Sequence, residues 1–263
     1  MMNYGFIGLG NMATAITCGM LRSGSFTDDK ILGFDISSDC CRAAEANGVE
    51  IKKSAEDLAD SSDVLVLAVK PQVAEGVYAR IKDRVQGKLI ISIAAGKTIE
   101  FLENGLGSDK LLVRVMPNIN AMVGAATCAY TVNANVTDEH KKITEKIFGT
   151  IGTIDELPEK LFSVFTAIGG SSPAFAYIYI DALARAGVQH GMTKAQALKF
   201  AAATVMGSAK MVLESGVHPM ELCDRVCSPA GTTIDGVMRL QAYGFEAAVH
   251  EAICAVVEKD KKL

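Results

Sequence analysis

Apolar runs alternate with helix-like stretches over the first ~115 residues, in the pattern of a doubly wound sheet. The continuous apolar runs 63–69, 88–94 and 111–116 are typical of strands buried on both faces. Shorter apolar runs at 4–7 and 31–35 precede them. Helices are predicted between these strands by capping residues and apolar periodicity, over residues 10–23, residues 37–48 and a short segment that begins at Ser54.

The pattern changes near residue 158. Two more strands are predicted at 124–133 and 151–154, on either side of a helix over 137–148, and the chain beyond is helical only. The helix that contains residues 175–184 is apolar on nearly every face. A helical domain of roughly 100 residues has difficulty burying such a helix alone, so burial against a second copy is expected. The sequence therefore predicts two domains, 1–158 and 159–263, and an oligomer.

A glycine-rich turn follows the first predicted strand, with the spacing G-x-G-x-x-A from Gly8 through Gly10 to Ala13. Gly8 permits the tight turn, Gly10 lets a pyrophosphate approach the backbone, and Ala13 lets the helix lie close on the strand. Asp35 ends the second strand, where an acid can bind ribose hydroxyls. These features predict a dinucleotide-binding loop, and the alternative is a glycine turn in another kind of α/β protein.

Composition excludes several classes of function. The net charge of −4 and the pI of about 5.6 argue against a general nucleic-acid binder. No apolar run is expected to span a membrane, and no leader precedes the first strand, so a cytoplasmic location is expected. The seven cysteines and four histidines are scattered, which predicts free thiols and no metal site.

Two stretches of small residues, 169–175 and 227–234, each end at a predicted helix N-terminus. Free amides there suit a carboxylate, although ordinary capped turns have the same pattern. Spacing assigns no acid/base pair, and the position of Lys70 at a strand end fits a cofactor contact better than a catalytic role.

Over essentially its whole length the chain resembles the pyrroline-5-carboxylate reductase family. The matching segments are GFIGLGNM (5–12), AVKPQ (68–72), SIAAG (92–96), RVMPN (114–118), GSSPAF (170–175) and SPAGTTI (228–234). The resemblance implies reduction of the cyclic imine 1-pyrroline-5-carboxylate to proline by a nicotinamide cofactor. It also implies a Rossmann domain followed by a helical domain that interlocks in a homodimer, which in many members assembles further into decamers.

The resemblance also implies site residues. Thr233 would hydrogen-bond the ring nitrogen as the catalytic residue, the amides of Thr232 and Thr233 would hold the substrate carboxylate, and Glu159 would lie near the substrate. The implied cofactor contacts are Ile7, Gly8, Leu9, Gly10, Asn11, Met12, Asp35, Ser37, Ser54, Ala68, Val69, Lys70, Pro71, Ile93, Ala94 and Ala95.

Three positions depart from the family pattern. Asp35 stands where many members have a small or neutral residue, and its charge favours NADH slightly over NADPH, with both expected to work. Ser37, Ser38 and Arg42 lie close enough in sequence to hold a 2′-phosphate instead. Ala230 replaces a common glycine, which is harmless if its φ is negative, and Ile119-Asn120 replaces a common Thr-Pro.

Two other classes of function fit the same architecture. The first is a related imine reductase or a β-hydroxyacid dehydrogenase. A dehydrogenase would need a lysine early in the helical domain, and the first one after residue 173 is Lys194. The second is a non-catalytic nucleotide sensor, which would have a damaged substrate loop, whereas residues 228–234 are intact.

Overall fold

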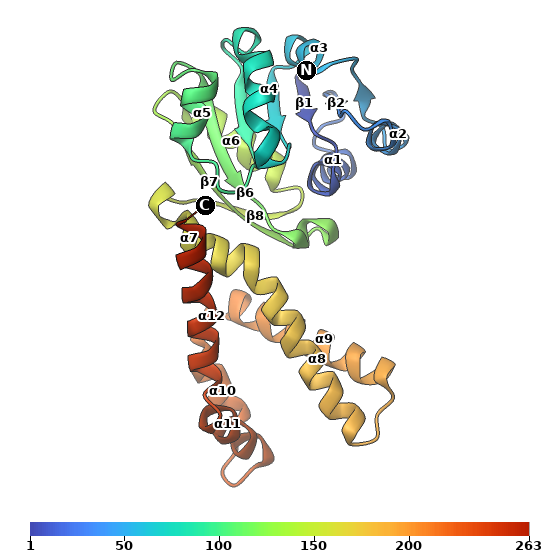
Figure 1. Cartoon of the computed structure of the whole chain (residues 1–263). Helices are drawn as coiled ribbons and strands as arrows, with labels where there is room; N and C mark the ends of the chain where they lie inside the picture. Colours follow the sequence, from blue (N-terminus) through green and yellow to red (C-terminus); the bar gives the residue numbers. More distant parts are fainter. Residues whose placement is uncertain (263) are drawn as a thin grey trace. The chain divides into compact units, whose positions relative to one another are not determined.

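The computed structural model describes residues 1–262, and within them eight strands form one sheet in the order β3-β2-β1-β4-β5-β6-β7-β8 (Figure 1). Neighbouring strands are parallel except β6 and β7, which run antiparallel. The predicted doubly wound parallel sheet is therefore confirmed, with one reversal. The strands are β1 (Asn3–Ile7), β2 (Lys30–Phe34), β3 (Glu50–Ile51), β4 (Val64–Leu67), β5 (Leu89–Ser92), β6 (Leu111–Met116), β7 (Ala126–Val132) and β8 (Gly152–Glu156).

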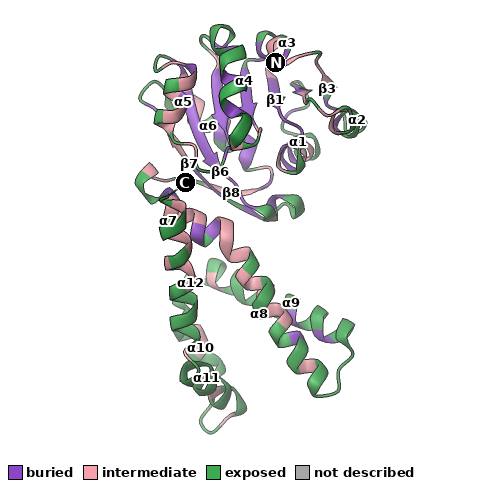
Figure 2. Cartoon of the chain, viewed as in Figure 1, coloured by how far each residue is buried: buried purple, intermediate pink, exposed green. Residues whose placement is uncertain are grey.

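Helices cover both faces of this sheet, and two hydrophobic clusters fill the layers between (Figures 1 and 2). β4 shows the division: Val64 and Val66 belong to one cluster, and Leu65 and Leu67 to the other, because successive side chains of a strand point to opposite faces. All four are buried, as expected for a strand inside a parallel sheet. The helices of this region are α1 (Asn11–Ser23), α2 (Ser38–Ala46), α3 (Ala55–Ser61), α4 (Ala74–Ile81), α5 (Ile99–Leu106) and α6 (Asp138–Phe148), with 3-10 turns at Pro71–Val73, Lys82–Arg84, Ile119–Val123 and Glu159–Leu161.

The chain divides into two compact units, one of Met1–Gly170 with the chain end from Lys259, and one of Ser171–Glu258. The second unit is helical, as predicted. The helices beyond the sheet are α7 (Phe162–Phe165), a π-helical turn (Thr166–Ser171), α8 (Ser172–Gln189), α9 (Lys194–Ser215), α10 (Pro219–Val226), α11 (Thr232–Ala242) and α12 (Phe245–Asp260).

α8 begins at Ser172 with Pro173 in its first turn, as predicted, but the stretch 169–175 does not form a loop with a free helix start. A π-helical turn leads directly into α8, so Glu159–Gln189 is one helical run. Pro173 has no N–H, and the carbonyl four residues earlier, that of Gly169, therefore lacks its α-helical donor. The buried side chain of Asn118 donates to this carbonyl at 2.9 Å. The helical run can thus continue through Pro173, although a proline in this sequence context usually indicates that a helix begins there.

By length and composition only, this helical run is long and apolar enough to cross a membrane. This finding corrects the expectation that no apolar run reaches the length of a membrane span. Small residues interrupt its apolar residues in the sequence, although an 18-residue window of the helix is apolar on average. In the single chain, α8 is not buried on every face: Ile178 is 71% exposed and Tyr177 is 55% exposed. Figure 2 shows mostly exposed and half-buried residues throughout the second unit, in contrast to the purple strands of the sheet.

Candidate active site

The glycine loop joins β1 to α1 with the geometry that the motif predicts. Gly8 has φ +93, and a Cβ built on it would lie 2.6 Å from the carbonyl oxygen of Ala68 at the end of β4. Only glycine fits there without a shift of the backbone. Gly10 is the N-cap of α1, and a Cβ on Gly10 would meet nothing within 4 Å. The backbone at Gly10 is therefore open to a ligand, and no side chain caps the first amides of α1, which can attract an anion.

Asp35 connects this loop to the end of β2. Its Oδ2 accepts a hydrogen bond from Leu9 N at 2.7 Å, and its Oδ1 accepts one from Ser37 N at 2.8 Å. Both carboxylate oxygens thus hold backbone amides, and each keeps capacity for one more donor. Asp35 therefore stabilises the loop in addition to standing where a ribose would bind.

A largely apolar cleft of about 470 Å³ lies at this edge of the sheet. Half of the sixteen predicted cofactor contacts line it, namely Ile7, Gly8, Gly10, Asp35, Ser37, Ala68, Val69 and Lys70. The other eight do not line it: Leu9, Asn11, Met12, Ser54, Pro71, Ile93, Ala94 and Ala95. Ser54 caps α3 by accepting from Asp57 N at 3.1 Å. The cleft has the glycine cradle, the helix N-terminus and the apolar walls that a dinucleotide requires, so its residues fit a nicotinamide cofactor.

Sequence reasoning missed seven residues of the cleft: Phe34, Ile36, Cys40, Ala55, Val73, Val77 and Arg80. Ile36, 92% exposed, stands at its rim. Val73, Val77 and Arg80 recur at helical spacing after Lys70-Pro71, which is the signal that could have identified them. Arg42, by contrast, pairs with Asp39 and does not line the cleft, so a contact between Arg42 and a 2′-phosphate stays a prediction.

Glu159 is tied into the first unit. Its Oε1 lies 2.8 Å from Arg114 Nη1 and accepts from Ile99 N at 2.9 Å. The Arg114 guanidinium is 4.3 Å from the ring centre of Phe162, and Arg114 is only 6% exposed. Glu159 therefore neutralises a buried cation, a role that no pattern in the sequence predicts.

Thr232 and Thr233 belong to the second unit, where they begin α11 after the N-cap Gly231. The helix start predicted for 227–234 is present, and both threonines are exposed. Alanine in place of the common glycine would be harmless only at a negative φ. Ala230 has φ +56, so the replacement has a cost here. Gly231 N donates to Ser228 O at 3.0 Å, which closes a tight turn around Pro229 and Ala230. An alanine in this left-handed conformation costs about 1–2 kcal/mol.

The described residues, 1–262, contain no group of three or more His, Cys, Asp or Glu side chains that could hold a metal ion. All seven cysteines are free. Burial raises the pKa of the Cys128 thiol to about 12, so this cysteine is an inert core residue.

The sheet, the glycine loop and the cleft define an NAD(P)H-dependent oxidoreductase of the Rossmann type. Residues 159–263 match the family model for pyrroline-5-carboxylate reductase dimerisation, and residues 3–96 match that of the coenzyme F420-dependent NADP oxidoreductases. The pyrroline-5-carboxylate reductase of Aquifex aeolicus is 42% identical over 100% of this chain and 97% of its own length. The chain belongs to the pyrroline-5-carboxylate reductase family.

Solved structures agree with this assignment. The pyrroline-5-carboxylate reductase of Coxiella burnetii superposes with a TM-score of 0.93 at 31% identity, over 99% of this chain and 98% of its own. The pyrroline carboxylate reductase of Plasmodium falciparum, with NADP bound, gives a TM-score of 0.86 at 33% identity over 99% and 97%. The predicted fold, with a Rossmann sheet followed by a helical oligomerisation region, is confirmed.

Proposed function

We propose that this chain reduces 1-pyrroline-5-carboxylate to L-proline, the last step of proline biosynthesis. The main support is the full-length match to reductases of that name, which includes both the glycine loop and the 228–234 loop. The bound cofactor supplies a hydride for the carbon of the C=N bond. The ring nitrogen, protonated beforehand, becomes a secondary amine.

The protein contributes binding and orientation in this proposal. Thr233 holds the ring nitrogen through its hydroxyl group, and the first amides of α11, at Thr232 and Thr233, receive the substrate carboxylate. Unpaired amides at a helix N-terminus attract an anion, which supports the second assignment. Asp35 and the residues that line the cleft hold the cofactor, and the eight predicted contacts outside the lining stay predictions. Glu159 also stays a prediction as a substrate contact.

Replacing Thr233 with valine is expected to lower kcat/KM for the cyclic imine by roughly 10- to 150-fold, the equivalent of a hydrogen bond to a charged group. The assay is loss of reduced nicotinamide absorbance with the imine and each reduced cofactor. Thr233→Ser, which keeps the hydroxyl group, should stay close to wild type. Unchanged kinetics in Thr233→Val would remove Thr233 from the mechanism. A wild-type chain that does not oxidise either cofactor with this imine would refute the function.

The active species in this proposal is a cytoplasmic homodimer, or a larger assembly such as a decamer, and Glu159–Gln189 contributes to the interface rather than to a membrane span. The domain boundary is proposed at residue 158. The exposed apolar side chains of α8 and α9, among them Ile178 and Leu213 at 71% and 84% exposure, support burial by a second copy. Sedimentation equilibrium should show a dimer or larger at nanomolar concentrations, and a stable, active monomer would contradict this.

A further inference from the structure

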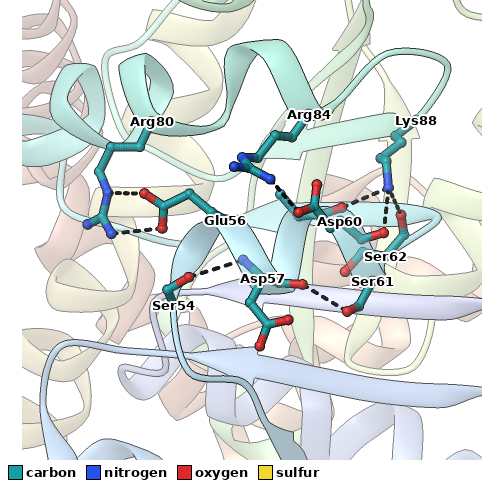
Figure 3. Close-up of polar contacts among 10 residues, drawn as sticks. Ser54, Glu56, Asp57, Asp60, Ser61, Ser62, Arg80, Arg84 and Lys88 are labelled. Atoms are coloured by element: carbon teal, nitrogen blue, oxygen red, sulfur yellow. Dashed lines mark hydrogen bonds and ion pairs between the residues drawn. The ribbon is translucent and has the colours of Figure 1, made fainter.

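Arg80 is held at the wall of the cofactor cleft by a carboxylate from the neighbouring helix. Its Nε and Nη2 atoms lie 2.7 and 2.8 Å from Oε1 and Oε2 of Glu56, a bidentate pair between α4 and α3 (Figure 3). Arg80 lines the cleft and Glu56 does not. Apart from the place of Arg80 in the cleft lining, the proposed function assigns no role to either residue.

The topology places this pair at the adenosine end of the cleft. Gly8, at the end of β1, marks the pyrophosphate position, and Asp35, at the end of β2, marks the ribose. β3 pairs with the outer edge of β2 and leads through Ser54 into α3, so Glu56 lies beside the ribose end. Arg80, bound to Glu56, shares the lining of the cleft with Asp35 and Ser37.

A 2′-phosphate on the ribose is what distinguishes NADPH from NADH, and an arginine near the ribose is the group that accommodates it. Arginine binds phosphate best through two parallel N–H groups. Here two such groups of Arg80, at Nε and Nη2, are already bound to Glu56. The bond from Arg80 lowers the pKa of the Glu56 carboxyl to about 2, which favours its charged form. Asp35 adds a second negative charge on the same side.

We propose that Glu56 is a specificity-determining residue: by holding and neutralising Arg80, it makes the cleft discriminate against the 2′-phosphate and favour NADH. This inference rests on the proposed function, because it assumes that the cleft binds a nicotinamide dinucleotide. A neutral residue at position 56 would release Arg80, so that its guanidinium becomes available to the phosphate. It would also remove the negative charge of Glu56, which repels the phosphate. Glu56→Gln should therefore change the ratio of the Kd values for NAD⁺ and NADP⁺ about tenfold toward NADP⁺.

The same two helices provide a matched control. Asp60 of α3 pairs with Arg84, which follows α4 (Figure 3). The two residues are 24 positions apart, as Glu56 and Arg80 are. Neither Asp60 nor Arg84 lines the cleft. Asp60→Asn removes one carboxylate from α3 and one inter-helix ion pair but does not free a cation at the cleft. It should leave the ratio of the two Kd values within twofold of wild type.

The test is isothermal titration of the wild-type protein and the variants Glu56→Gln, Arg80→Met, Glu56→Gln/Arg80→Met and Asp60→Asn with NAD⁺ and NADP⁺. The fragments 5′-AMP and 2′,5′-ADP repeat the comparison without the nicotinamide. We expect Glu56→Gln to shift the ratio of the two Kd values in the wild-type background. The shift should be absent when Glu56→Gln is added to Arg80→Met, and it should be weaker in high salt.

The outcomes separate the two proposals. A wild-type protein that binds neither dinucleotide overturns the proposed function and this inference together. If the wild-type protein binds the dinucleotides but Glu56→Gln changes the ratio of the two Kd values less than twofold, the inference alone is overturned. The same holds if Asp60→Asn changes this ratio as much as Glu56→Gln does. A shift that persists in the Arg80→Met background also overturns it, because the effect would then not act through Arg80.

Discussion

Replacing Glu159 with alanine is expected to lower the free energy of unfolding by about 3 kcal/mol. Removal of one partner from a buried ion pair costs about 3–5 kcal/mol, because the remaining charge is uncompensated. The side chain of Arg114 is 8% exposed, and that of Glu159 is 33% exposed, which places the cost at the lower end of that range. The amide of Ile99 also loses its acceptor. Urea unfolding at a fixed protein concentration measures the change.

Two variants separate the charge from the hydrogen bond. Glu159→Gln keeps an acceptor for Ile99 N but leaves Arg114 without a counter-charge. Glu159→Gln combined with Arg114→Met also removes the buried cation, so it should recover most of the stability that Glu159→Gln loses. A Glu159→Ala protein with wild-type stability but a raised KM for the imine would show that Glu159 acts on the substrate and not on Arg114.

Replacing Gly8 with alanine is expected to weaken dinucleotide binding by roughly 100- to 1,000-fold. A Cβ at φ +93 would lie 2.6 Å from the Ala68 carbonyl oxygen and 3.1 Å from Val69 N, both backbone atoms of the β4 end that cannot yield cheaply. The strain costs about 1–3 kcal/mol, and displaced amides lose charge-assisted bonds worth about 1.5–3 kcal/mol. Fluorescence titration with NADH measures the binding, and thermal unfolding measures the strain.

Gly10→Ala is the matched comparison for this prediction. Gly10 has φ −72, and a Cβ there would meet nothing within 4 Å, so the fold should tolerate alanine. If the cofactor occupies that space, Gly10→Ala lowers binding without lowering the melting temperature, whereas Gly8→Ala lowers both. Normal NADH binding in Gly8→Ala would show that the pyrophosphate does not bind at this loop.

The sequence by itself determined every strand of the described sheet except the two-residue β3, together with the glycine loop and the helical second half. β4 and β5 are buried on both faces, so their residues are apolar except for Ser92 at the end of β5, and that information is local. The loop is equally legible, because a tight turn and a close backbone approach each require glycine at a fixed position. Ser54 caps its helix as expected, since a cap involves residues only three positions apart.

Only the tertiary structure decided features that depend on groups far apart in the chain. Asn118 lies 51 residues before Gly169, whose carbonyl it binds, and this bond lets a helix continue where Pro173 signals a start. Glu159 meets Arg114 across 45 residues, and Arg80 meets Glu56 across 24. A charged residue in sequence gives no sign of its partner, because the pairing is set by how helices and strands pack. Ala230 is the local counterpart: its φ of +56 is imposed by the closed turn in which it lies, against the preference of its own side chain.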